Sequence, residues 1–327
     1  MKKLLSLTLA LVMIVTCLAG LASAATIATI ETNGKTVEAA TVADLVAAID
    51  ASGKSVVTLK ADVYVNGNTT IPYSCTIDLN GHTWESDKSN AITIGAVGTE
   101  NTTTTLKNGI VKHAVVGFRV NAGGFVVSNV TMKGTGGANI CMYDNSGKYN
   151  DVNLIENCTL VSDIYGTVGY NKKDTDFSNC NITIKDTTMV CPKEAGSVNF
   201  IRQGSASKMG NITLGTGVTI YSYKPDAYQV GGYTFSGETL TAETALAAIE
   251  VPAFGLKFAG MSKWATPATP APVVPETPAT PAVPEAPATP SAPSTPAPSV
   301  PATGVSVVAL GVMAVVSLAG AVITKKH

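Results

Sequence analysis

A short phrase with an asparagine at its centre recurs through the middle of the chain and limits the folds that are possible. Its copies end at Asn80, Asn108, Asn129, Asn157 and Asn179, roughly 20 to 30 residues apart. Alternating apolar residues precede each asparagine, and a second apolar or threonine-rich run follows it. Asparagine tolerates the left-handed backbone of a tight corner, so each copy predicts a strand, a bend and a strand.

A second series of short apolar runs follows the first at a nearly constant offset. Its members are 91–94, 116–120, 139–142, 166–170 and 198–201. Each turn of chain therefore supplies about three short strands, with too little sequence between them for crossover helices. This pattern predicts an all-β solenoid, a parallel β-helix with strands stacked about 4.8 Å apart.

The asparagine series and the phrase Thr76-Ile-Asp-Leu-Asn-Gly-His-Thr83 resemble the right-handed parallel β-helix proteins, the superfamily that includes pectate lyases and many bacterial surface proteins. The resemblance implies that the five asparagines stack into a structural ladder at one corner. It does not specify an activity, because fold does not imply function.

Two segments have the pattern expected of helices that cap a solenoid. Residues 41–50 and 241–250 each begin with a threonine, carry an acid early in the segment and continue with alanine and aliphatic residues. The first and last turns of a solenoid expose apolar core, so caps are required. We expect one domain over 25–264, with 251–264 packed back along its last turn. Capped ends favour a monomer.

The two ends of the chain predict export and anchoring. Residues 1–24 have a basic start, an apolar core and a small-residue cleavage site at Ala24, which is typical of a secretory signal peptide. Cys17 could suggest lipoprotein processing, but Ile14-Val15-Thr16 lacks the leucine and small residues usual there. Residues 265–300 are rich in proline, alanine and threonine, which predicts a disordered, extended stalk without a core.

The last segment, 300–327, resembles the sortase cell-wall sorting signal of Gram-positive bacteria. It holds Val300, Pro301, Ala302, Thr303 and Gly304, then an apolar run long enough for a transmembrane helix, then a basic tail. The resemblance implies cleavage after Thr303 and its linkage to peptidoglycan, with the membrane contacted only before sorting. Val300 stands where leucine is usual, which leaves the sortase class open. A plain transmembrane anchor is the alternative.

Charge and cysteine usage exclude some functions. The net charge is -1, and without the four terminal lysines 18 basic residues face 23 acidic ones, so a nucleic-acid partner is not expected. The five cysteines after the signal segment, an odd number, lack Cys-x-x-Cys spacing, so we expect neither a metal nor another cofactor. Cys158 and Cys180 each follow a ladder asparagine, which predicts adjacent positions as stacked buried thiols or as a disulfide.

Candidate ligand-binding residues lie in or just after the second strand series. Arg119, Tyr143, Asp144, Tyr170 and Arg202 could form a glycan-binding strip, in which aromatic faces meet sugar rings and charges meet acidic groups. Alternation with Phe118 and Val120 points Arg119 outward. The competing interpretation is an ordinary solvated sheet face.

No acid–base pair or calcium cluster of the lyase type can be placed, so no catalytic residue is assigned. The sequence favours a cell-wall-anchored surface protein that binds glycans or host proteins. An anchored polysaccharide lyase or glycoside hydrolase is the alternative, and it requires at least three carboxylates, or two with an arginine, in one groove.

Overall fold

The computed structural model describes residues 25–95, 102–143, 149–163, 166–192, 201–204, 206–224 and 235–270. The chain divides into two units at residue 272, and all described residues belong to the first. The signal peptide with Ala24, the stalk beyond residue 270, and the sorting signal with its apolar run lie outside the described residues. Within the described ranges, no helix is long and apolar enough to cross a bilayer.

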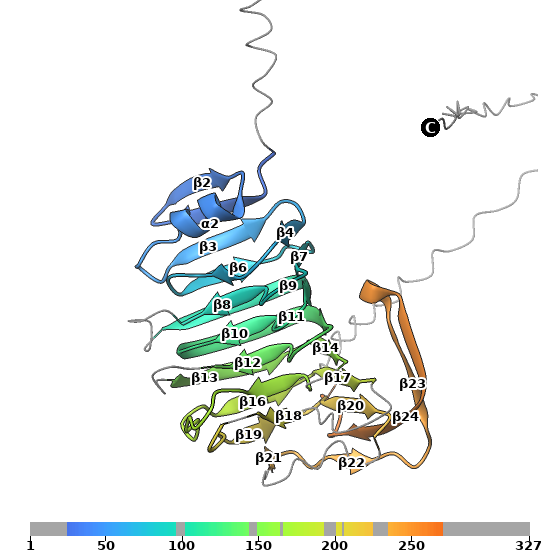
Figure 1. Cartoon of the computed structure of the whole chain (residues 1–327). Coiled ribbons are helices and arrows are strands. Elements are labelled where there is room, and N and C mark those ends of the chain that lie inside the picture. The colour runs from blue at the N-terminus through green and yellow to red at the C-terminus, as the bar shows by residue number, and fades with distance from the viewer. Residues whose placement is uncertain are drawn as a thin grey trace, which may run out of the picture. The chain divides into compact units, whose positions relative to one another are not determined.

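The described part is an all-β structure of mostly parallel strands, which confirms the predicted class (Figure 1). The first series of strands pairs in parallel in chain order. It consists of β3 (Ser55–Leu59), β6 (Cys75–Asp78), β9 (Thr103–His113), β11 (Gly123–Gly134), β13 (Tyr149–Glu156), β16 (Ile182–Lys185), β19 (Ile212–Leu214) and β21 (Phe235–Gly237).

A second parallel series begins after the corner of each turn. It consists of β4 (Val63–Val65), β7 (Thr83–Ser86), the later halves of β9 and β11, β14 (Thr159–Ser162), β17 (Thr188–Cys191) and β20 (Thr219–Ser222). A separate sheet holds β5 (Thr69–Thr70), β8 (Ile92–Ile94), β10 (Phe118–Val120), β12 (Ile140–Met142), β15 (Val168–Tyr170) and β18 (Ile201–Gln203). Three strands per turn are thus observed, an arrangement compatible with a solenoid.

The corner between the first and second series uses the left-handed backbone that the asparagines predicted. Asn80, Asn108, Asn129 and Asn157 all have φ between 49° and 59°. Asn129 Nδ2 donates to Asn108 Oδ1 over 3.2 Å, and Asn108 Nδ2 donates to the carboxylate of Asp78. The corner therefore joins neighbouring turns by side-chain hydrogen bonds as well as by the backbone ladder.

The assignment of Asn179 to this corner was wrong. Asn179 lies in a turn before β16, whereas the corner residue of that turn of chain is Asp186, with φ of 46°. Aspartate shares with asparagine the short polar side chain that tolerates this conformation. The phrase Lys185-Asp-Thr-Thr188 matches Ser128-Asn-Val-Thr131 in spacing, and this signal was available in the sequence.

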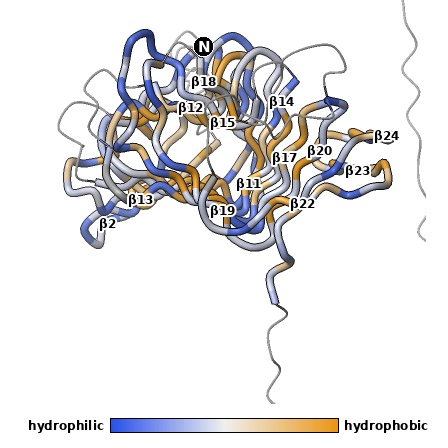
Figure 2. The backbone as a smooth tube through the Cα atoms, turned by 90° about the horizontal axis from the view of Figure 1, so that it is seen from below, coloured by the Kyte–Doolittle hydropathy of each residue, from blue (hydrophilic) through white to orange (hydrophobic). Residues whose placement is uncertain are grey.

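The core lies inside the stacked strands, where apolar side chains alternate with outward polar ones. Trp84, Phe118, Phe125 and Phe177 are its largest fully buried side chains apart from Tyr170. Figure 2, which views the strands from below, shows hydrophobic positions along the strands and hydrophilic ones at several of the bends between them.

The N-terminal cap contains the predicted helix and, before it, a hairpin that was not predicted. Strands β1 (Ala28–Thr32) and β2 (Lys35–Ala39) form a hairpin, and β1 continues the sheet by antiparallel pairing with β3. Helix α2 (Val42–Ala48) follows, and Thr41 and Asp44 form a reciprocal capping box at its start. The helix buries Leu45 completely in the core.

The second helix, predicted over 241–250, does not form. The segment holds β22 (Thr241–Ala242) and β23 (Ala247–Val251), and β23 pairs antiparallel with β24 (Leu256–Ala265) across the 3-10 turn η1 (Pro252–Phe254). Here tertiary pairing overrides helix propensity. The prediction that 251–264 packs along the last turn holds only for its end, where Ser262 to Trp264 pair antiparallel with β20. Val251 and Met261 pack instead on Val161 and Val190 of earlier turns.

The five cysteines in the described ranges are all buried thiols. The prediction that Cys158 and Cys180 are neighbours on adjacent turns was wrong. The pairing of β14 with β17 places Thr187, and not Cys180, opposite Cys158. Burial raises the pKa of Cys75, Cys158 and Cys191 to about 12, which keeps these thiols protonated and unreactive at neutral pH.

Candidate functional site

The outer face of the second strand series carries a column of polar side chains. In register from one strand to the next, Tyr64 is followed by Glu85, Lys112 and Lys133. These residues point outward because their neighbours Trp84, Val111 and Met132 are fully buried in the core. Parallel pairing thus places one side chain about every 4.8 Å along the column.

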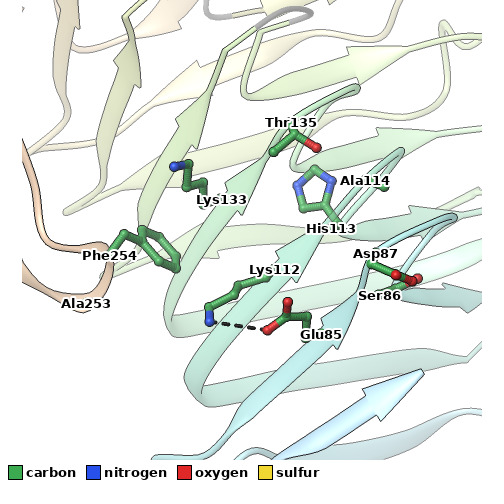
Figure 3. Close-up of a pocket in the computed structure, with 10 residues that line it drawn as sticks. All are labelled: Glu85, Ser86, Asp87, Lys112, His113, Ala114, Lys133, Thr135, Ala253 and Phe254. Atoms are coloured by element: carbon green, nitrogen blue, oxygen red, sulfur yellow. Dashed lines mark ion pairs between the residues drawn. The ribbon is translucent and has the colours of Figure 1, made fainter. Parts of the chain in front are cut away.

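A groove of about 480 Å³ lies over this column, and we call it the outer groove. Glu85, Asp87, Lys112, Lys133 and Thr135 line its floor (Figure 3). Ala253 and Phe254, from the η1 turn between β23 and β24, form the opposite wall. The groove therefore combines charged groups from three adjacent strands with an aromatic ring from a segment distant in the sequence.

The two lysines of the outer groove differ in their partners. Lys112 Nζ lies 3.2 Å from Glu85 Oε2, in an ion pair that is partly exposed. Lys133 forms no ion pair with any residue that the structure describes. An ammonium group without a carboxylate partner at the edge of a groove is available to an anionic or hydroxyl-bearing ligand.

A smaller hollow of about 110 Å³ adjoins the outer groove and shares Glu85 and Lys112 with it. Asp62 lies in this hollow, where it accepts a hydrogen bond from the Thr83 backbone over 2.9 Å and lies 3.4 Å from His82 Nδ1. Tyr64 lies at the same place, and its hydrogen bond to Asp87 raises the pKa of its hydroxyl. Each nearby carboxylate thus already has a partner.

The wall of the groove is held by a second apolar cluster outside the main core. Val161 and Val190, which continue the outward column on β14 and β17, are covered by Val251 and Met261 of the hairpin. Phe254, Leu256 and Phe258 pack against the same cluster. The hairpin therefore covers the part of the sheet face where the column is apolar, and the groove begins where the column becomes charged.

His113 and Ser86 border the groove, but their positions alternate with those of Lys112 and Glu85, so their side chains face inward. The His113 ring is 3% exposed and its Nε2 accepts a hydrogen bond from Asn139 Nδ2 over 3.2 Å. The ring occupies the space beside Gly134 that a larger side chain would need. Desolvation lowers the pKa of His113 to about 3, opposed in part by the Val115 backbone.

The sequence-predicted strip is only partly assembled. Arg119 and Tyr143 come together, with the guanidinium carbon 3.9 Å from the ring centroid and Arg119 Nε donating to Asn121 Oδ1. Burial of Phe118 and Val120 confirms that Arg119 points outward. Tyr170 was wrongly assigned to the strip, since it is fully buried and its hydroxyl donates to the Cys180 carbonyl oxygen.

The two remaining residues of the strip are Asp144 and Arg202. Asp144 lies outside the described residues. Arg202 lies on β18 opposite Gly169, in the column that also holds Arg119 and Cys141, but its side chain is not among those described. One aromatic face of Tyr143 is already covered by Arg119.

The outer groove was missed in the sequence, although part of its signal was there. The phrases Trp84-Glu-Ser86, Val111-Lys-His113 and Met132-Lys-Gly134 each place a charged residue after an apolar one, a few positions beyond a corner asparagine. Lys112 and Lys133 each lie four residues after their corner asparagine and Glu85 lies five after Asn80, a near-constant spacing that would have suggested one outward column. Phe254 could not be found in this way, because its position depends on where the hairpin packs.

The charged groups that line the outer groove are two carboxylates and two lysines, and Glu85 is already paired with Lys112. Among the described residues, no group of three or more His, Cys, Asp and Glu is arranged to hold a metal ion. Comparisons of the chain with protein-family models, with curated proteins and with solved structures find no match.

Proposed function

We propose that this protein is a surface protein of a Gram-positive bacterium whose β domain, a right-handed parallel β-helix, binds a glycan in the outer groove. The observation that carries the proposal is that Phe254 and Lys133 line opposite sides of one groove of about 480 Å³ (Figure 3). An aromatic ring offers a flat apolar face to a sugar, and the ammonium group serves a hydroxyl or an acidic substituent. The adjoining hollow would lengthen the site for a chain of sugars.

Secretion, the stalk and covalent attachment at Thr303 complete the proposal, on the strength of the two terminal sequence signals. In this arrangement the stalk holds the β domain away from the cell wall. The test is a Thr303→Ala variant expressed in a Gram-positive host with a sortase. We expect the chain to leave the peptidoglycan-linked fraction. If the Thr303→Ala chain stays in the peptidoglycan-linked fraction, sorting at this residue is contradicted.

Binding is tested with the purified full chain on an array of neutral, amino and acidic glycans, followed by calorimetric titration of the glycans retained. Phe254→Ala and Lys133→Ala should each weaken binding about tenfold or more, since a tenfold change corresponds to about 1.4 kcal/mol. Tyr73→Ala and Lys107→Ala serve as controls. Tyr73 is 42% exposed, and neither residue lines the groove. Equal effects of all four variants would contradict the site.

The same samples should be assayed by ultraviolet absorbance for unsaturated products and by reducing-end release. We expect binding without product, because each carboxylate near the groove is already paired. Product formation that Glu85→Gln abolishes would overturn the binding function in favour of a polysaccharide lyase or glycoside hydrolase.

A further inference from the structure

Strand β24 joins the wall of the outer groove to the C-terminal segment of the chain. Its first part, up to Met261, pairs antiparallel with β23, and its last part, Ser262 to Ala265, pairs antiparallel with β20. Gly260 lies just before the change of partner and has φ of 73°. Trp264 and Ala265 also pair with β22 on the other side. The end of β24 is therefore held between two strands.

The chain stays bound after β24 ends. The backbone N–H of Thr266 donates to the Val218 carbonyl, and the Thr266 hydroxyl accepts from the Val218 N–H and donates to the Gly215 carbonyl, each over 2.9 Å. Thr266 is 5% exposed. Although residues 265–300 were expected to form a free stalk, the first of them are fixed to the corner of the last turns.

Three further contacts continue this attachment. The Gly217 N–H donates to the Pro267 carbonyl over 2.7 Å, the Thr269 and Thr216 hydroxyls lie 3.0 Å apart, and the Thr269 hydroxyl also donates to Asp186. Asp186 and Gly217 are the left-handed corner residues of two successive turns. We call residues 266–269, with these partners, the C-terminal clamp.

The clamp and the groove wall lie at opposite ends of the same strand. Phe254 and Gly255 directly precede β24, and Thr266 directly follows it. Between them, Met261 is buried in the outer apolar cluster and Trp264 in the main core. A displacement of β24 along its axis would break the pairing with β20, β22 and β23 together, because all three ladders run along the strand.

We propose that β24 couples the C-terminal clamp to the outer groove, so that release of the clamp withdraws Phe254 and opens the groove. Tension in the C-terminal segment would act first on residues 266–269. Once these contacts break, the force would act along β24 and shear its pairing with the neighbouring strands, which would then move the η1 turn. The coupling is a property of the described strands alone. Its consequence for ligand binding rests on the proposed function.

The test is hydrogen exchange of the purified full chain, read at individual amides of β23, η1 and β24. Thr266→Val keeps the shape of the side chain but leaves the Val218 N–H and the Gly215 carbonyl without their side-chain partner. We expect exchange at Ile249, Val251 and Phe258 to rise about tenfold, because local opening becomes easier by roughly 1.4 kcal/mol. Thr131→Val, the same substitution in the second strand series of a distant turn, is the control and should leave these amides unchanged.

An increase confined to 215–219 and 265–269 would overturn the coupling. A rise in exchange throughout the chain, including β6, would mean that Thr266→Val destabilises the whole domain. The coupling is then tested with Thr269→Ala, which removes only the exposed contacts to Asp186 and Thr216. A smaller rise at the hairpin amides would then support the proposal, and none would refute it. The measurement requires no ligand, so its failure is distinguishable from a failure of glycan binding.

Discussion

Residues 41–50 and 241–250 look alike in sequence but fold differently. Both begin with threonine, carry an acid in the next few positions and continue with alanine and aliphatic residues. The first is a capped helix, whereas the second contributes strands β22 and β23. The difference arises because Leu45 finds a place in the core beneath the helix, while β23 finds a pairing partner in β24. In segments this short, tertiary contacts decide between helix and strand.

The largest expected effect concerns β24, the strand that pairs with both strands of the second segment. Trp264 is 3% exposed and packs in the main core, so Trp264→Ala should lower the free energy of unfolding by about 3–5 kcal/mol. Urea unfolding followed by circular dichroism measures this. Lys257→Ala, at an exposed position of the same strand, is the control and should change stability by less than about 0.5 kcal/mol. Equal effects would mean that β24 does not stabilise this end.

The next effect is the loss of stability in acid that buried His113 is expected to cause. Its pKa of about 3 is below the usual value of about 6.5. As the pH falls, His113 is therefore protonated in the unfolded chain before it is protonated in the folded one. The contribution of His113 to the free energy of unfolding is complete above pH 6.5. It falls as the pH drops towards 3, by at most about 1.4 kcal/mol per pH unit. His113→Gln should flatten this dependence in acid unfolding curves. An unchanged slope would exclude His113 as its source.

The two leading threonines offer a direct comparison. Thr41→Ala removes the capping box and should cost about 1 kcal/mol. Thr241→Ala, in a two-residue exposed strand, should cost less than about 0.5 kcal/mol. Thermal unfolding of the two variants measures the difference. A loss at Thr241 as large as that at Thr41 would indicate that a helix does form in the second segment.

The smallest effect is expected from the ion pair between Glu243 and Lys263, whose atoms lie 2.5 Å apart. The hydrogen bond to Glu243 raises the pKa of Lys263 above 10.5, so this stabilisation is present at neutral pH and is lost as the pH rises through the raised pKa. Glu243→Gln should cost about 0.5 kcal/mol at pH 7, and the cost should shrink as the pH rises through the raised pKa of Lys263. A pH-independent loss would assign the effect to packing.

Much of the site was beyond sequence reasoning for a physical reason. The alternation of Arg119 with buried neighbours correctly predicted its outward direction, because strand geometry is local. Tyr170 was assigned to the strip from its place in the second series of short apolar runs and not from alternation. In register it follows Val120 and Met142, and its ring packs 5.5 Å from that of Phe177 inside the core. That register depends on which strands stack on one another, which a single strand does not encode.

The sequence by itself determined the local features: the all-β class, the left-handed corners at Asn80, Asn108, Asn129 and Asn157, and the capped helix α2. Each depends on a few adjacent residues, whose steric and hydrogen-bonding preferences act over one turn of chain. Only the tertiary structure decided that Asp186 replaces Asn179, that β24 lies between β20 and β22, and that Phe254 faces Lys133 across a groove. Those outcomes depend on which distant strands bury each other, and burial is shared by the whole stack.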